Sequence, residues 1–253
     1  MKLQDRVAIV TGGGTGIGRG ISEAFGREGA TVIVNYSRSR EDAEQTAKAI
    51  CSAGGRAIAV PADVSKDADA RALMDRAAQE FGRLDILVNN AGWSKIIPHA
   101  KLEELTDEIW DRTLNTNLRG AFYCMRAAVP HLRKQTGSCI INIASVAAFA
   151  GSGSSIAYAA SKGGLLTMTK SFARILAPEV RVNAIAPGFV RTRFADWPAS
   201  AFDHGEAITP TKKLPTPEDF GALSVYLAAD GLQITGQTIE MDGGLFSLGP
   251  PRV

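Results

Sequence analysis

Short apolar runs rich in β-branched residues alternate with longer segments of helical spacing along almost the whole chain. Runs such as Val7–Val10 are continuously apolar, which is typical of strands covered on both faces of a parallel sheet. The strands predicted on this basis are Arg6–Thr11, Thr31–Asn35, Ala57–Pro61, Leu84–Asn89, Ser138–Ile143, Arg181–Ala186 and Gln237–Met241.

The segments between these strands repeat apolar residues at helical spacing. The predicted helices are Ile17–Glu28, Arg40–Ala53, Asp67–Phe81, Asp107–Arg133, Ser155–Leu176 and Pro217–Ala229. Strands alternating with helices indicate right-handed βαβ units. We therefore predict an α/β fold: a single doubly wound (Rossmann) domain over residues 1–253, with about seven parallel strands and helices on both faces.

The stretch from 190 to 215 shows no regular period and contains three prolines. At about 25 residues it is longer than the usual connection between elements, so it is either a substrate lid or a disordered insert. Phe194, Trp197 and Phe202 favour a lid, because in an insert they would be exposed apolar surface.

Charge and cysteine usage narrow the class of protein. The chain has 253 residues, with 28 basic and 26 acidic side chains and a net charge of +2, which gives no reason to expect nucleic acid or membrane as a partner. Cys51, Cys124 and Cys139 are scattered without C-x-x-C spacing, so we expect reduced thiols and no metal site. No signal peptide and no apolar run of ~18 residues is visible, which favours a cytoplasmic protein.

A glycine cluster follows the first predicted strand and precedes the first helix. Glycine permits positive φ and close approach of the backbone, and a helix N-terminus favours an anion. A flexible turn is the alternative, but this position is where dinucleotides bind in such folds. The residues predicted to bind phosphate are Gly12, Thr15, Gly16, Ile17 and Gly18.

The end of the second strand bears on the choice of cofactor. An acidic residue here would accept hydrogen bonds from the adenosine ribose, but this chain has Asn35 followed by Tyr36, Ser37 and Arg38. A guanidinium and hydroxyls suit a 2′-phosphate, which predicts NADP(H) over NAD(H). The alternative is that Arg38 and Arg40 belong to a solvated loop.

Tyr158 and Lys162 lie four residues apart and so on one helical face. A nearby ammonium favours phenolate, so we expect Lys162 to lower the pKa of Tyr158. Such a pair also occurs on ordinary surface helices. Ser145, however, ends a predicted strand at the carboxyl edge of the sheet, where ligands bind, and the three residues together indicate a proton-transfer site.

In order and combination, these motifs make the chain resemble the short-chain dehydrogenase/reductase family, in particular the single-domain branch that includes 3-oxoacyl-carrier-protein reductase and glucose dehydrogenase. The resemblance runs from Val7 to Gly244. It is carried by Thr11-x-x-x-x-Gly16-Ile17-Gly18, Asp63-Val64, Asn89-Asn90-Ala91-Gly92, Asn117, Ser145, Tyr158-x-x-x-Lys162, Pro187-Gly188 with Thr192, Thr235-Gly236 and Asp242-Gly243-Gly244.

The resemblance implies an oxidoreductase that interconverts a ketone and a secondary alcohol. Tyr158 would be the general acid/base, Lys162 would lower its pKa and hold the nicotinamide ribose, and Ser145 would bind the carbonyl. Asn117 would support a water chain to Lys162; Asn115 is the competing choice. The implied cofactor contacts are Asp63 and Val64 for adenine, Asn90, Ala91 and Gly92 for the cleft wall, and Pro187, Gly188, Val190 and Thr192 for the nicotinamide.

One position departs from many NADP-using relatives, because Thr15 stands where they carry a basic residue. The 2′-phosphate is then left to Tyr36, Ser37 and Arg38, and use of NAD(H) as well remains open. The competing function on this fold is a catalytically silent dinucleotide sensor or scaffold.

The resemblance further implies a homotetramer built on the two long helices and the last strand. Apolar residues on more than one face of the second of these helices support it: Leu165, Leu166, Met168, Phe172, Ile175 and Leu176. The histidines at 99, 131 and 204 lack ligand spacing and are interpreted as solvated or core residues. Trp93, Ser94, His99 and Trp197 are candidates for lining a pocket for a small carbonyl or alcohol substrate.

Overall fold

The computed structural model describes residues 1–249, and in this part of the chain seven parallel strands form one sheet in the order β3-β2-β1-β4-β5-β6-β7. The strands are β1 (Val7–Val10), β2 (Thr31–Tyr36), β3 (Arg56–Pro61), β4 (Ile86–Asn89), β5 (Ser138–Ile143), β6 (Val180–Pro187) and β7 (Thr238–Met241). The predicted fold class is confirmed. All seven predicted strands are present, with ends that differ by a few residues.

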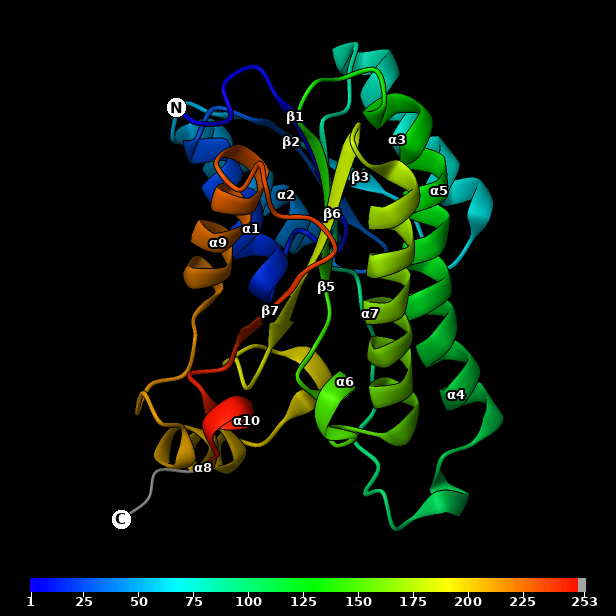
Figure 1. Ribbon diagram of the computed structural model, residues 1–253, viewed down its shortest axis with the longest axis vertical. Helices are drawn as coiled ribbons and strands as arrows, with labels where there is room; N and C mark the ends of the chain where they lie inside the picture. Colours follow the sequence, from blue (N-terminus) through cyan, green and yellow to red (C-terminus); the bar gives the residue numbers. More distant parts are fainter. Residues whose placement is uncertain (250–253) are drawn as a thin grey trace.

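Helices cover both faces of the sheet. α1 (Gly16–Arg27), α2 (Arg40–Ser52) and α9 (Pro217–Ala229) lie on one face, and α3 (Asp67–Phe81), α5 (Gly120–Leu132) and α7 (Ile156–Leu176) lie on the other (Figure 1). α4 (Asp107–Leu114) runs into α5. Short helices α6 (Ala147–Ala150), α8 (Ala199–Ile208) and α10 (Leu245–Leu248) gather beyond the carboxyl ends of β5, β6 and β7 (Figure 1).

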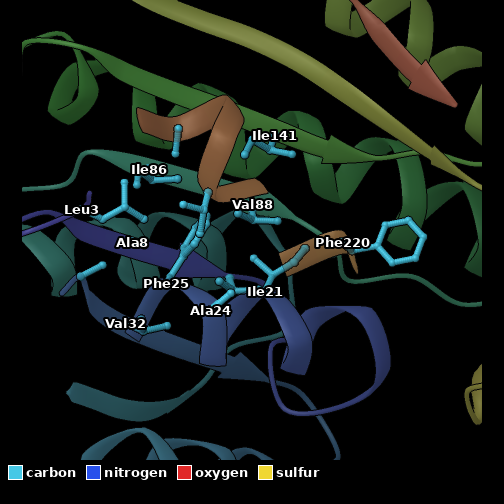
Figure 2. Packing of buried hydrophobic residues seen from close by; sticks show 14 of the residues in the cluster. Leu3, Ala8, Ile21, Ala24, Phe25, Val32, Ile86, Val88, Ile141 and Phe220 are labelled. Atoms are coloured by element: carbon cyan, nitrogen blue, oxygen red, sulfur yellow. The ribbon is translucent and has the colours of Figure 1, made fainter. Parts of the chain in front are cut away.

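Each face of the sheet has its own apolar core. Figure 2 shows Phe25 and Ile21 of α1 packed among strand side chains such as Ala8 and Val88. Phe25, Ile21 and Ala8 have no exposed surface. Strands buried on both sides explain why the sequence shows continuous apolar runs instead of alternation.

The predicted helix Asp107–Arg133 is interrupted. A π-helical turn over Asn115–Arg119 separates α4 from α5, although the helical direction continues through it. π-turns insert one residue into the hydrogen-bond ladder and leave no periodic signal strong enough to read from the sequence. α7 begins at Ile156, one residue later than predicted, because Ser155 is its N-cap and accepts the amide of Tyr158 at 3.2 Å.

The strand order reverses at β1 and β4, since β2 and β3 follow on one side and β5 to β7 on the other. Ligands bind outside the carboxyl ends of strands at such a switch point. Within residues 1–249, no helix has the length and apolar character needed to cross a membrane.

Candidate active site

A cleft of about 1130 Å³ runs along the carboxyl edge of the sheet, from the end of β2 to α10. Most of the predicted site residues line it: Gly12, Thr15, Gly16, Ile17, Tyr36, Ser37, Arg38, Asp63, Val64, Asn90, Ala91, Gly92, Ser145, Tyr158, Lys162, Pro187, Gly188, Val190 and Thr192. Gly18 and Asn117 do not line this cleft; both are buried.

The cleft has two halves, each lined by its own set of chain segments. The glycine-turn half is drawn from residues 12–17, 35–39, 62–65 and 90–92, and the lid half from residues 188–202 and 242–246. Ser145 follows β5, which lies between β4 and β6 in the sheet, so it stands between the two halves.

The glycine turn is fixed by polar contacts from neighbouring strands. The amide of Gly12 donates to Asn35 Oδ1 at 3.3 Å, and Asn90 Nδ2 donates to the carbonyl oxygens of Thr11 and Gly12 at 2.9 and 3.0 Å. Gly12 has φ +60°, and a Cβ at Gly18 would lie 2.3 Å from the Gly12 carbonyl oxygen. Glycine is therefore required both for the turn and for the close approach of the helix to it.

The N-terminus of α1 opens into the cleft at this turn. Its N-cap residue, Thr15, makes no side-chain capping hydrogen bond, and the first turn carries no acidic residue. The first-turn amides and the positive end of the helix dipole therefore suit an anion. Gly16, with φ +50°, keeps the space between the turn and Thr192 free of a side chain. The arrangement fits the pyrophosphate of a dinucleotide.

Asp63 lies at the end of β3 and faces the far end of the glycine-turn half. Its carboxylate accepts from Ser65 N and Ser65 Oγ, at 3.1 and 2.7 Å. Although burial opposes ionisation, these hydrogen bonds and the charges of Lys66 and Arg38 hold the pKa of Asp63 below its ordinary value. The carboxylate is thus ionised and in a defined orientation at neutral pH.

Arg112 of α4 is a cleft residue that the sequence reasoning missed. Its guanidinium lies over the Trp93 ring, with Cζ 4.0 Å from the ring centroid. Burial and the positive charge of Arg38 lower the pKa of Arg112, while Asp63 opposes this shift. Two guanidiniums and one carboxylate thus lie within electrostatic range of one another at this end of the cleft, which leaves an excess positive charge.

Ser145 and Tyr158 meet at the middle of the cleft. Ser145 is buried, and its Oγ accepts the amide of Ala147 at 3.2 Å. The Tyr158 hydroxyl lies close enough to the Ser145 side chain for Ser145 to influence the pKa of the phenol. The loop that enters α7 makes this possible, because the Ser155 cap fixes the first helical turn on which Tyr158 lies.

Lys162 is one turn further along α7 and is only 4% exposed. Its Nζ donates to the carbonyl oxygen of Ile143, the last residue of β5, at 2.7 Å. Burial lowers the pKa of Lys162 to about 8. The amine is therefore mostly protonated at neutral pH and lies 5.7 Å from the Tyr158 ring centroid.

The predicted lowering of the Tyr158 pKa is wrong for the structure. Burial dominates and raises the pKa of Tyr158 to about 12, while the nearby Ser145 side chain opposes the shift. The amine of Lys162 donates to the Ile143 carbonyl oxygen, and burial outweighs its effect on the pKa of the phenol. Tyr158 is a neutral phenol at physiological pH.

Asn117, in the π-helical turn, is 1% exposed and tied to the loop after β4. Its Oδ1 accepts the amide of Trp93 at 2.7 Å, and its Nδ2 donates to the Trp93 carbonyl oxygen and to Ser161 Oγ. Asn117 and Lys162 border the same small space behind the cleft, whereas Asn115 does not. The choice of Asn117 over Asn115 and the water chain to Lys162 both stay predictions.

The segment predicted as a lid carries ordered helical structure: a short 3₁₀ turn (Phe194–Asp196) and α8. Thr192 faces Gly16, and Arg193 pairs with Asp42 of α2 at 2.8 Å. The lid segment therefore contacts the glycine-turn half across the cleft.

Two other features of the cleft were not predicted from the sequence. The hydroxyls of Ser94 and Ser154 lie 2.5 Å apart and join the loop after β4 to the loop before α7. Leu245 and Phe246 of α10 line the cleft although the sequence predicted no element there. Both features bring together segments that are distant along the chain, and no local sequence pattern indicates them.

The histidines do not gather at the site. His131 Nε2 lies 3.0 Å from Asp75 Oδ1, a carboxylate neighbour that its sequence surroundings did not indicate, and His204 is exposed. His99 Nε2 is buried without a hydrogen-bond partner. Over residues 1–249, no three His, Cys, Asp or Glu side chains are grouped so that they could hold a metal ion.

Comparison with known proteins places this geometry in context. Residues 12–246 match a family model described as enoyl-(acyl carrier protein) reductase. A Streptomyces violaceoruber protein, provisionally named as ketoacyl reductase 2 of the granaticin polyketide synthase, is 42% identical over 94% of this chain and 95% of its own length. The 3-oxoacyl-(acyl-carrier-protein) reductase of Thermotoga maritima is 35% identical over 97% of this chain and 99% of its own.

Solved structures of similar proteins also match this chain over nearly its full length. A short-chain dehydrogenase/reductase from Serratia marcescens superposes with a TM-score of 0.90 at 34% identity, covering 98% of this chain and 100% of that one. A Brucella melitensis protein described as a short-chain dehydrogenase/reductase and glucose/ribitol dehydrogenase gives a TM-score of 0.89 at 32% identity, covering 96% of this chain and 98% of that one. Both values show a shared fold over nearly the full length of the three proteins.

Proposed function

Because this chain belongs to the short-chain dehydrogenase/reductase family, whose members are oxidoreductases that use nicotinamide dinucleotides, we propose that it interconverts a ketone and a secondary alcohol. The observation that carries the proposal is that Ser145 and Tyr158 line one cleft together with the glycine turn. Two relatives are named for reduction of a keto group, which supports a carbonyl as the reacting group.

The proton chemistry follows from the two hydroxyls. The cofactor supplies the hydride in reduction and accepts it in oxidation. Ser145 holds the substrate oxygen and stabilises the negative charge that develops on it. Tyr158 donates its proton to that oxygen in reduction and recovers it in oxidation. A phenol with a pKa raised to about 12 is protonated at neutral pH, which suits reduction.

Lys162 contributes as a buried cation between strand and helix. With a pKa of about 8 it is mostly charged at neutral pH. A positive charge here stabilises phenolate as Tyr158 gives up its proton, and the ammonium has two donors left besides its bond to Ile143. We assign these donors to the hydroxyls of the nicotinamide ribose.

The remaining cleft residues would hold the cofactor. The glycine turn and α1 receive the pyrophosphate, Asp63 and Val64 the adenine, and Asn90, Ala91 and Gly92 form the wall between them. Pro187, Gly188, Val190 and Thr192 lie on the nicotinamide side.

We propose a preference for NADP(H), with NAD(H) also accepted. The support is electrostatic: Arg38 and Arg112 outnumber Asp63 at the adenine end, and Tyr36 and Ser37 add hydroxyls. A 2′-phosphate would satisfy that excess positive charge, whereas a ribose hydroxyl would not. Arg112 thus joins Arg38 as a candidate phosphate ligand.

Substitution of Tyr158 tests the function directly. Tyr158→Phe removes the transferable proton and keeps the ring, so turnover of a ketone should fall by about 10²- to 10⁴-fold. The dissociation constant for NADPH should stay within about twofold, because the hydroxyl is not needed to bind the phosphates. Wild-type turnover in this variant would refute the mechanism.

Two other functions give different results in the same assay. A dinucleotide sensor would bind NADPH without consuming it against any substrate. The matched family model is described as an enoyl reductase, so a carbon–carbon double bond is the second candidate reacting group. Faster turnover of crotonyl-CoA than of any ketone would favour that assignment.

We also propose that residues 190–215 act as a substrate lid on a single domain and that the protein is a homotetramer. Ile175 of α7 is 63% exposed and Trp110 of α4 is 36% exposed, so both helices present apolar side chains outward. A monomer at micromolar concentration in light scattering would contradict the tetramer.

A further inference from the structure

The lid half of the cleft is walled by aromatic side chains. Phe189 and Trp197 meet edge to face, with ring centroids 5.8 Å apart, and Phe194 packs 5.7 Å from the Tyr158 ring. Aromatic rings at these separations and tilts form favourable contacts with one another and with any ring placed beside them. The lid half therefore presents aromatic, apolar surface close to the Tyr158 ring.

A second pair of aromatic side chains lies where α10 meets α6; Phe246 of this pair lines the cleft, and Phe149 contacts Phe246. Phe246 of α10 lies 5.4 Å from Phe149 of α6, and these side chains remain 40% and 42% exposed. Phe194 is also 37% exposed. Exposed aromatic side chains gathered around a cleft are typical of a surface that becomes covered when a ligand binds.

The charged residues of the lid half are either arginines paired with carboxylates or acidic residues. Arg193 pairs with Asp42, and Arg191 pairs with Asp203 and Glu206. Asp242, which is 4% exposed, accepts the amides of Gly244 and Phe246.

Asp196 lines the same half as an exposed carboxylate. A free carboxylate repels a phosphate or carboxylate group on an incoming ligand. A buried anion also needs a paired cation, and the arginines of the lid are engaged with carboxylates.

We propose that the substrate is an uncharged ketone whose carbonyl carbon belongs to, or is attached directly to, an aromatic or fused ring system. This rests on the ketone–alcohol function proposed above. The carbonyl oxygen lies at Ser145 and Tyr158, and the ring system lies between Phe194, Trp197 and Phe246. In reduction the carbonyl carbon gains a hydride from the reduced dinucleotide, and its oxygen gains the Tyr158 proton. The alcohol and the oxidised dinucleotide leave.

Three ketones distinguish the possibilities when NADPH consumption is followed with the wild-type protein. 2-Tetralone presents a fused aromatic ring, 2-butanone presents the carbonyl without a ring, and acetoacetyl-CoA presents it on an anionic thioester. We expect kcat/KM for 2-tetralone to exceed that for 2-butanone by about 10²-fold, because the ring removes apolar surface from water. We expect acetoacetyl-CoA to be turned over no faster than 2-butanone.

Substitutions in the aromatic wall test whether these side chains cause the preference for 2-tetralone. Phe246→Ala and Trp197→Ala should each lower the 2-tetralone to 2-butanone ratio of kcat/KM by about tenfold, since they remove the ring's contacts but not the catalytic hydroxyls. Leu248→Ala is the matched control, because Leu248 lies on α10, is 77% exposed and does not line the cleft. That control should leave the ratio unchanged.

The outcomes separate the two proposals. Turnover of 2-butanone or acetoacetyl-CoA at or above that of 2-tetralone overturns the ring preference and leaves the ketone reductase standing. An unchanged ratio in both aromatic variants also overturns it. No turnover of any ketone overturns the proposed function, and this inference with it.

Discussion

The two halves of the cleft are held together by different kinds of contact. In the glycine-turn half, backbone groups of Thr11 and Gly12 are joined to Asn35 and Asn90 by hydrogen bonds of 2.9 to 3.3 Å. In the lid half, the wall is made of aromatic contacts such as Phe189–Trp197 and of ion pairs between exposed side chains. The first kind fixes atoms to a fraction of an ångström. The second fixes mainly shape and polarity.

The contrast matches what each half has to bind. A phosphate group requires donors at set positions, so a backbone turn held by neighbouring strands is well suited to it. A ring system needs apolar surface of the right size, which side chains on a separate segment can provide. The first half is therefore expected to tolerate little change, and the second to tolerate more.

The largest expected effect compares two phenylalanines. Phe25 has no exposed surface and lies in the core beneath the glycine-turn half, whereas Phe202 of α8 is 8% exposed in the lid half. Phe25→Ala should lower the free energy of unfolding by about 3 to 5 kcal/mol. Phe202→Ala should lower it by less than about half of that, because Phe202 lies on a peripheral helix outside the main hydrophobic cores. Urea denaturation measures both, and equal losses would remove the distinction.

Lys162 lies between the halves, and its burial should be visible in the pH dependence of stability. Its pKa is about 8 in the folded protein and 10.5 ordinarily, so the unfolded chain binds more protons between these values. Wild-type stability should therefore rise from pH 8 to 10.5. Lys162→Met should be more stable than the wild type below pH 8, by up to about 3 kcal/mol, and the gap should close toward pH 10.5.

Thermal unfolding of both proteins across this pH range checks the prediction. A gap that stays constant with pH would show that the lysine is not destabilised by burial. Lys170→Met, on the exposed side of the same helix, is the matched control.

Substitution of two glycines compares the crowded glycine turn with an uncrowded position on α7. A Cβ at Gly18 would lie 2.3 Å from the Gly12 carbonyl oxygen, so Gly18→Ala should cost about 1 to 3 kcal/mol of stability. By displacing the turn it should also weaken NADPH binding. Gly163 of α7 has its nearest neighbour at 3.9 Å, so Gly163→Ala should stabilise by about 0.5 to 1 kcal/mol. Denaturation together with NADPH titration measures both, and a harmless Gly18→Ala would contradict the requirement for glycine.

The smallest effect concerns cofactor choice. Arg38→Gln and Arg112→Gln should each weaken NADPH binding by about tenfold and change NADH binding by less than about twofold, because the neutral amide loses the charge-assisted contact to the 2′-phosphate. Arg19→Gln, in an exposed pair with Glu23, is the control. Titration of both nucleotides decides the matter. Equal losses for NADPH and NADH would mean that the arginines serve the adenine or the pyrophosphate instead.

The sheet and the glycine-turn half were predicted well from the sequence because both depend on local sequence patterns. Continuous apolar runs define buried strands, and glycines at a strand–helix junction define the turn. Ser145, Tyr158 and Lys162 were also recognisable, since the strand end and the i, i+4 spacing place them near one edge.

The missed features depend on segments far apart in the sequence. Arg112 reaches the cleft only because the π-helical turn connects α4 to α5 beside Trp93, and α10 reaches it because β7 ends there. The pKa of Tyr158 was predicted in the wrong direction because spacing reports neighbours but not burial. Desolvation depends on the whole fold around a residue.

Asn35 restricts how the nucleotide preference of this scaffold can be redesigned. Its Nδ2 donates to the carbonyl oxygens of Val60 and Ala62 at 3.3 and 3.1 Å, while its Oδ1 accepts from Gly12. An aspartate here would set a carboxylate oxygen against two carbonyl oxygens inside the protein, so a change meant for the nucleotide would first damage the scaffold. An engineer seeking an acidic ribose contact must place it further along the chain, at Tyr36 or Ser37, where the side chain can reach the nucleotide without supporting the sheet.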